Sequence, residues 1–263
     1  MEAAEQPEFD HFIPYLGMDL WHEGTSTFGQ ATITPQMLVS GVERLRLGLL
    51  FTMADVVAGS PSTGILTPTI DLRLQLLRPA PCRGEVLLEA RPVKIGRRLW
   101  TGEVLCYGPD LFARSEYTFM NNHLSDTPSL PETRTGKSLP APSFDDLFRM
   151  RVLEDGVIEM DAHEAVRNGM AGTIQGGAQA TMAEVAAETA LAARGEHAVW
   201  DLSVRYLNAL KEGPAVARAD VLPASDQHPV VRVAITDEGA GGRIVSMAVA
   251  VCRPATAMGR SAP

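Results

Sequence analysis

The stretch GTIQGGAQATMAEVAAETALAAR, residues 172–194, decides the fold. A glycine-rich turn leads into an alanine-rich apolar run that carries two acids, Glu184 and Glu188. A related stretch, RLGLLFTMADVVAGSP, occupies residues 46–61, and there Thr-Met-Ala again precedes an acid, Asp55. The sequence therefore contains one helix motif twice, with Asp55 and Glu184 at equivalent positions.

The repeat continues downstream of both acids. TIDLRLQLL (69–77) matches VWDLSVRYL (199–207), and GEVLLEARPV (84–93) matches GPAVARADVL (213–222). Two more matching runs end near Met120 and Pro254, and the segment between the copies is rich in Pro, Ser and Thr. We therefore predict a first unit at 1–120 with an N-terminal extension, a linker at 121–142, a second unit at 143–254 and a tail at 255–263.

Hydrophobic periodicity predicts the same architecture for each unit. Residues 69–76 alternate between apolar and polar side chains, which indicates a half-buried strand, and three further strand-like runs follow. The preceding helix is apolar nearly all round, so other elements must wrap it. We expect an α+β fold in which two antiparallel sheets each wrap a long central helix and join edge to edge as a pseudo-dimer.

The amino-acid composition narrows the classes of function that the protein can have. The 263 residues are 45% hydrophobic and 21% charged, typical of a soluble globular protein, and the net charge of −9 argues against a nucleic-acid partner. Three scattered cysteines indicate reduced thiols, and the histidines lack metal-ligand spacing. Without a signal peptide or an apolar run of about 18 residues, we expect a cytoplasmic protein with no membrane partner and no metal.

The helix motif resembles that of the PaaI-like acyl-CoA thioesterases, which have the hotdog fold and the pattern N-x-x-G-x-x-H-G-G-x-x-x-T-L-x-D. The second unit departs from it with Gln175 in place of the histidine and one extra residue after the asparagine. The first unit keeps GLLFTMAD but has Arg46-Leu47-Gly48 in place of His-Gly-Gly. The resemblance implies a double hotdog that hydrolyses thioesters. The second unit matches at Asn168, Gly172, Gly176, Gly177, Thr181 and Glu184.

Each residue type in the motif admits two interpretations. A carboxylate in an apolar helix is either a structural acid satisfied by its neighbours, or a general base or nucleophile whose pKa burial raises. Glycines that open a helix serve a tight turn or close packing, or they let a carbonyl approach the unpaired first-turn N–H groups. We expect Glu188, one turn after Glu184, at a solvated rim.

The resemblance further implies that each site forms across both units. The better preserved site takes Asn168, Gly176 and Gly177 from the second unit, and Asp55 and Thr69 from the first.

The reciprocal site would combine Glu184 with Leu47 and Gly48, and Val199 stands where a hydroxyl residue is expected. We therefore expect one working site, with the second inactive or reduced to acyl binding.

A basic segment, VKIGRRLW at 93–100, resembles the family's K-x-G-R-R-L segment. The resemblance implies that Lys94, Arg97 and Arg98 meet the phosphates of coenzyme A, which is part of the substrate and not a separate cofactor. The alternative is a solvated hairpin. The second unit has no basic residue at the matching place, which again favours a single ligand site.

Two other functions stay open. A non-catalytic module that binds acyl-CoA or an acyl carrier is favoured by Gln175 and by the altered turn of the first unit. A double-hotdog dehydratase or hydratase depends on a catalytic histidine pattern that the sequence lacks. In each case we expect an acyl-CoA or acyl-carrier ligand, and a homo-oligomer of double-hotdog chains.

Overall fold

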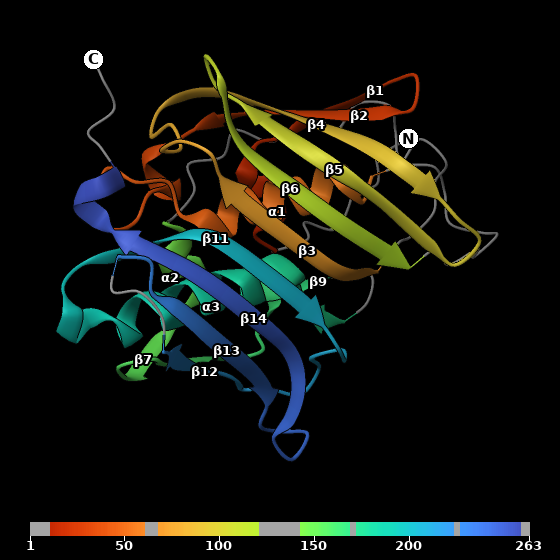
Figure 1. Cartoon of the computed structure of the whole chain (residues 1–263). Helices are drawn as coiled ribbons and strands as arrows, with labels where there is room; N and C mark the ends of the chain where they lie inside the picture. The colour runs from red at the N-terminus through yellow and green to blue at the C-terminus, as the bar shows by residue number, and fades with distance from the viewer. Residues whose placement is uncertain (1–10, 61–67, 121–142, 169–171, 224–226, 259–263) are drawn as a thin grey trace, which may run out of the picture.

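The computed structural model describes residues 11–60, 68–120, 143–168, 172–223 and 227–258, so the predicted linker lies outside the described residues. Twelve strands form one antiparallel sheet in the order β1-β2-β4-β5-β6-β3-β11-β14-β13-β12-β8-β7 (Figure 1). The helices α1 (Leu47–Ala58) and α3 (Gly176–Ala190) both lie against one face of this sheet. No helix among the described residues is long and apolar enough to span a membrane.

The strands fall into two sets of six on either side of the β3–β11 pair. The first set contains β1 (Asp19–Glu23), β2 (Ser26–Ile33), β3 (Thr69–Leu76), β4 (Gly84–Ile95), β5 (Leu99–Tyr107) and β6 (Leu111–Met120). The second contains β7 (Arg151–Glu154), β8 (Val157–Met160), β11 (His197–Tyr206), β12 (Ala215–Leu222), β13 (Val230–Asp237) and β14 (Arg243–Pro254). The strands β9 (Arg167–Asn168) and β10 (Thr173–Ile174) pair separately. The short helix α2 (Phe144–Phe148) precedes β7.

The strand order follows the sequence repeat. Outward from the centre, β3, β6, β5 and β4 correspond to β11, β14, β13 and β12, which are the matched segments of the two units. The predicted edge-to-edge joint is therefore present. Arg73 pairs with Ser203 at its middle, and the Arg73 guanidinium binds Asp201 across the joint, with Nε–Oδ1 at 2.9 Å and Nη2–Oδ2 at 2.5 Å.

The two long helices pack on each other in antiparallel directions. Gly48 lies against Thr181, and Gly177 lies against Thr52, so a Cβ at either glycine would collide with the facing threonine. Each threonine hydroxyl turns back to the carbonyl four residues earlier, at 2.7 Å for Thr52 to Gly48 and 2.9 Å for Thr181 to Gly177. The repeated Gly and Thr therefore serve close helix packing.

The segment before β1 packs on the second half of the molecule. The Phe12 N–H donates to the Ala165 carbonyl at 2.9 Å. Its ring meets those of Phe144 and Phe148 in α2, with centroids 6.3 Å and 4.8 Å apart. At the other end, residues of the predicted tail form a short 3-10 helix, η5 (Ala255–Met258), whose first N–H donates to Glu196. Both ends of the described chain are therefore tied to the second half.

Candidate active site

The antiparallel helix pair places each acid of the repeat beside the start of the other helix. Because Thr52 faces Gly177, the next turn of α1, which carries Asp55, faces the N-terminus of α3. Likewise Thr181 faces Gly48, so Glu184 faces the N-terminus of α1. Each acid thus lies across the helix contact from the first turn of the other unit's helix.

Asp55 is held at its position by the first residue of β3. It is half-buried, and the Thr69 hydroxyl donates to Oδ1 at 2.7 Å. Burial raises the pKa of Asp55 to about 6, against the lowering effect of the Thr69 hydrogen bond. The carboxylate is therefore more basic than an ordinary aspartate and still mostly charged at neutral pH.

The facing start of α3 keeps one backbone donor open. The Gln175 side chain caps the helix by accepting from the N–H of Gly177. Among the described residues, the N–H of Gly176 has no acceptor. An N–H at this position lies at the positive end of the helix dipole, so it can bind an anionic oxygen.

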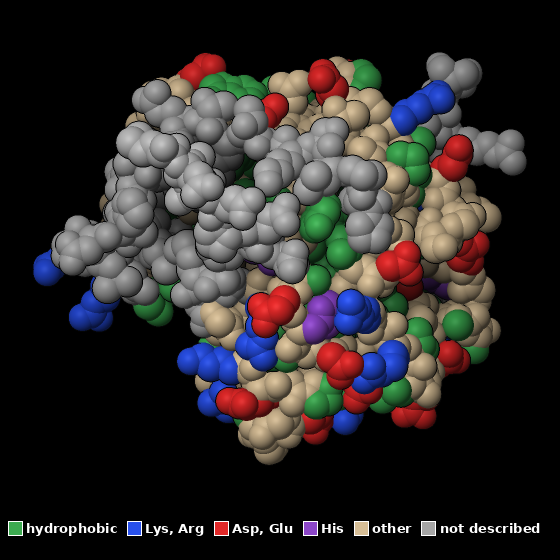
Figure 2. Space-filling view, turned by 180° about the vertical axis from the view of Figure 1, so that it is seen from behind, with side chains coloured by type: hydrophobic (Ala, Val, Ile, Leu, Met, Phe, Trp, Pro, Cys, Tyr) green, Lys and Arg blue, Asp and Glu red, His purple; other side chains and the backbone are tan. Residues whose placement is uncertain are grey.

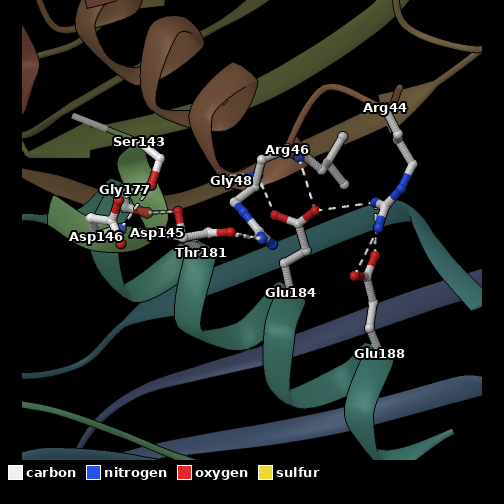
Figure 3. A network of polar contacts seen from close by, with 11 residues as sticks. Arg44, Arg46, Gly48, Ser143, Asp145, Asp146, Gly177, Thr181, Glu184 and Glu188 are labelled. Atoms are coloured by element: carbon white, nitrogen blue, oxygen red, sulfur yellow. Dashed lines mark hydrogen bonds and ion pairs between the residues drawn. The ribbon is translucent and has the colours of Figure 1, made fainter. Parts of the chain in front are cut away.

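Glu184 has a different environment, although it occupies the equivalent place in the repeat. It is fully buried, and its carboxylate accepts from the N–H of Leu47 at 2.9 Å and from that of Gly48 at 2.8 Å. Figure 3 shows the side chain reaching from α3 to the start of α1. The first-turn donors of α1 are therefore occupied by a carboxylate of the protein itself.

Two arginines lie near this carboxylate, and only Arg44 contacts it. Arg44 lies 3.4 Å from Glu184 and 2.8 Å from Glu188, and Arg46 lies 2.8 Å from Asp145 (Figure 3). Burial lowers the pKa of Arg44, but the Glu188 and Glu184 carboxylates outweigh it and raise the pKa overall. The prediction of a solvated Glu188 is wrong: it is half-buried, binds Arg44 and accepts from the Val199 N–H at 3.1 Å.

Chain length accounts for the difference between the two acids. Glutamate has one methylene more than aspartate, which lets Glu184 reach across the helix contact to the two N–H groups of α1. Asp55 makes its hydrogen bond to Thr69 within its own unit, and Gln175 caps the helix that Asp55 faces. One helix start is thus filled, whereas the other keeps the Gly176 N–H open beside a carboxylate.

The remaining predicted residues belong to two other elements, β9 and the β4–β5 hairpin. Asn168 belongs to β9, where its backbone pairs with Thr173. Lys94, Arg97 and Arg98 are exposed on the β4–β5 hairpin, which closes with the Gly96 N–H on the Leu99 carbonyl. Figure 2 shows basic side chains projecting at the left edge, where this hairpin lies.

The hairpin lies at the same end of the sheet as Thr69. In register, Thr69 of β3 pairs with Phe119 of β6, which pairs with Trp100 of β5, which pairs with Ile95 of β4. Three strand spacings of about 4.8 Å separate Thr69 from the hairpin, or about 14 Å. An extended ligand can span that distance.

Tyr206 is a member of this site that the sequence prediction missed. Its hydroxyl donates to the Gly176 carbonyl at 2.8 Å, and the charge of Asp55 contributes to raising its pKa. The signal was present in the repeat, because Tyr206 aligns with an apolar residue, Leu76, in the first unit. A polar residue at one copy of an apolar repeat position marks a difference between the two sites.

Other features of the described residues lie away from Asp55. Surface cavities of about 450 Å³ and 360 Å³ open beside Tyr107 and beside the loop at residues 35–43. Within the described ranges no group of three or more His, Cys, Asp or Glu could hold a metal ion. Residues 61–67, which connect Asp55 to Thr69 along the chain, lie outside the description.

Comparisons with known proteins agree with this architecture. Residues 46–109, which include Asp55 and Thr69, match the model of the thioesterase superfamily. No curated protein matches the sequence significantly.

Solved structures share the fold along most of the chain. The tesB protein of Mycobacterium avium subspecies paratuberculosis is 16% identical with a TM-score of 0.63, covering 89% of this chain and 94% of its own. A conserved protein with the hot dog fold from Alicyclobacillus acidocaldarius is 13% identical with a TM-score of 0.59, covering 89% and 94%. The 12:0-ACP thioesterase of Umbellularia californica is 11% identical with a TM-score of 0.58, covering 89% and 99%. This chain therefore shares the fold of hotdog proteins.

Proposed function

We propose that the chain is a double hotdog that hydrolyses an acyl thioester at one site, built around Asp55. The observation that carries the proposal is the half-buried Asp55 carboxylate, whose pKa is raised and which Thr69 holds in place. It lies beside a helix start with an open N–H at Gly176. The match of this region to the thioesterase superfamily supports the same chemistry. The PaaI-like subfamily is part of the proposal and rests on the repeated helix motif.

The Asp55 carboxylate and the Gly176 N–H have different roles in the proposed reaction. The Asp55 carboxylate takes a proton from water as the water oxygen bonds to the thioester carbon, or it attacks that carbon itself. The carbonyl oxygen becomes negatively charged and is stabilised by the Gly176 N–H and the dipole of α3. When the tetrahedral intermediate collapses, the carbon–sulfur bond breaks and the thiolate leaves and takes up a proton. If Asp55 was the attacking group, the acyl group is left on Asp55 as an anhydride, and water then hydrolyses this anhydride to release the carboxylic acid and the Asp55 carboxylate. Asn168 is proposed as a further contact with the acyl group or its carbonyl.

Glu184 is assigned a structural role in this proposal. An attacking carboxylate needs a free oxygen and a neighbouring donor for the carbonyl, and the reciprocal position offers neither. Both oxygens of Glu184 accept backbone hydrogen bonds, and the donors at Leu47 and Gly48 are the ones that would have held a carbonyl. In the second pseudo-site, the protein's own Glu184 carboxylate therefore occupies the place of the thioester carbonyl.

Coenzyme A is the thiol carrier that the basic hairpin favours. The hairpin lies about three strands from Thr69, a distance that an extended pantetheine arm can cover. Lys94, Arg97 and Arg98 would then meet phosphate groups as exposed cations. An acyl carrier protein is the alternative, supported by the fold shared with the 12:0-ACP thioesterase.

A thiol-release assay tests the proposal. The full chain is incubated with short-chain, long-chain and aryl acyl-CoA and with acyl carrier proteins, and free thiol is measured over time. We expect release from at least one class, with kcat/KM rising as the pH passes about 6, where Asp55 loses its proton. Tight binding of every ligand without thiol release would instead identify a non-catalytic acyl-binding module.

A further inference from the structure

Tyr206 links the second half of the sheet to the start of α3. It is the last residue of β11, where it pairs with Ser246 of β14. From there its ring lies against Gly176, so closely that a Cβ at Gly176 would be 2.9 Å from the ring carbon Cζ. A side chain at Gly176 would therefore push against Tyr206, whereas one at Gly177 would collide with Thr52.

The peptide group between Gly176 and Gly177 is held at both of its polar ends. Its carbonyl accepts from the Tyr206 hydroxyl at 2.8 Å, and its N–H donates to the Gln175 side chain. The peptide group before it, which carries the Gly176 N–H, turns relative to it only about the two backbone bonds of Gly176, so holding one peptide group restrains the other. The Gly176 N–H is the open donor at the helix start that lies across the helix contact from the Asp55 turn.

The Tyr206 phenol keeps its proton at neutral pH, because its pKa is raised above the ordinary value of a tyrosine. Burial is the main cause that raises the pKa of Tyr206, and the charge of Asp55 raises it further. Tyr206 therefore lies within electrostatic range of the carboxylate and keeps its proton for the Gly176 carbonyl. Thr69 and Asp55 approach from the first unit, and Tyr206 and Gln175 from the second.

The repeat gives an internal comparison. In the first unit the position of Tyr206 is taken by Leu76, which is buried and offers no hydroxyl to the start of α1. There the helix start is held by Glu184 instead. A tyrosine hydroxyl thus holds the helix start at the open site, and the residue at the matching position of the closed site has no hydroxyl.

We propose that Tyr206 is a positioning residue, which with Gln175 locks the first peptide of α3 so that the Gly176 N–H points at the oxygen of the bound thioester. The inference rests on the proposed function, and it adds to it a residue outside the helix motif. Tyr206 acts through Gly176, so its removal should lower kcat and leave KM and the pH midpoint unchanged.

Tyr206→Phe tests this, with Tyr107→Phe as the matched control, because Tyr107 is a half-buried tyrosine of β5 in the other half. We expect kcat to fall about 3- to 10-fold in Tyr206→Phe, as for the loss of one hydrogen bond, and Tm to stay within a few degrees. The control should keep the wild-type kcat.

Amide hydrogen exchange of the segment 172–182 provides a readout that does not depend on activity. Exchange at the start of α3 should be faster in Tyr206→Phe and unchanged in Tyr107→Phe. If the wild type hydrolyses thioesters but Tyr206→Phe keeps full kcat, the positioning role is wrong. If the wild type shows no hydrolysis, the proposed function fails. Unchanged amide exchange in Tyr206→Phe would separately refute the role of the Tyr206 hydroxyl in holding the helix start.

Discussion

Asp55 and Glu184 occupy equivalent places in the repeat, and their partners differ. Asp55 accepts from one hydroxyl, and Glu184 accepts from two backbone N–H groups and lies beside Arg44. The sequence predicted both acids and favoured Asp55 as the working one. It could not predict that Glu184 fills the start of α1, because that depends on one methylene across a contact between residues 136 and 137 positions apart.

Asp55→Asn is predicted to stabilise the protein at neutral pH. The pKa of Asp55 is raised to about 6, so the folded state binds more protons than the unfolded state between about pH 4 and pH 6. Stability from this group therefore falls as the pH rises through that window, and above it the charged carboxylate costs about 1–3 kcal/mol. Asparagine removes the charge and can still accept from Thr69.

Urea unfolding at pH 8 and pH 4 measures this effect. The free energy of unfolding of Asp55→Asn should exceed that of the wild type at pH 8, and the two should converge at pH 4. A variant less stable than the wild type at pH 8 would show that Asp55 is a structural acid.

At the scale of elements, periodicity predicted the strand at residues 69–76 and the buried helix that precedes it, and both are confirmed as β3 and α1. The role of the helix glycines was predicted less completely. Gly177 was expected either to serve close packing or to hold a carbonyl; it lies against Thr52, and its N–H donates to the Gln175 side chain. A contact between helices in different units leaves no local trace in hydrophobic pattern.

Gly48→Ala should destabilise the protein, because its Cβ would enter the space of Thr181. Overpacking of this kind costs about 1–3 kcal/mol in free energy of unfolding. Gly108→Ala is the control, since a Cβ there would meet Pro81 at an ordinary 3.5 Å. Thermal and urea denaturation compare the two, and a Gly48→Ala protein as stable as the control would mean that the helices separate without cost.

For the whole molecule, the repeat predicted a joined sheet, and the pairing of β3 with β11 confirms that joint. The packing of Phe12 on Phe144 and Phe148 could not be predicted, because it joins the chain before β1 to residues beyond the linker. Such contacts depend on the shape of the whole folded molecule. The sequence pattern predicts that shape only where the two units repeat each other.

The basic hairpin is predicted to act on substrate affinity alone. Arg97→Ala/Arg98→Ala should raise KM for an acyl-CoA up to about tenfold, as expected for two exposed charge contacts, and leave kcat within about twofold. Arg218→Ala/Arg232→Ala is the matched control, since both arginines are exposed on β12 and β13. Steady-state kinetics at low salt decide, and an unchanged KM in the hairpin variant would make it a solvated turn.

The most direct measurement of the central claim, one open site at Asp55 and one closed by Glu184, is kcat/KM for Asp55→Asn and Glu184→Gln beside the wild type. Asp55→Asn should lose about 10²- to 10⁴-fold, since it removes the base or nucleophile. Glu184→Gln should keep hydrolysis within about tenfold while its free energy of unfolding falls by about 3–5 kcal/mol, because Arg44 and the α1 donors lose a buried charge. Activity lost in folded Glu184→Gln and kept in Asp55→Asn would contradict the account by placing the working site at α1, and activity kept in both would make both acids structural.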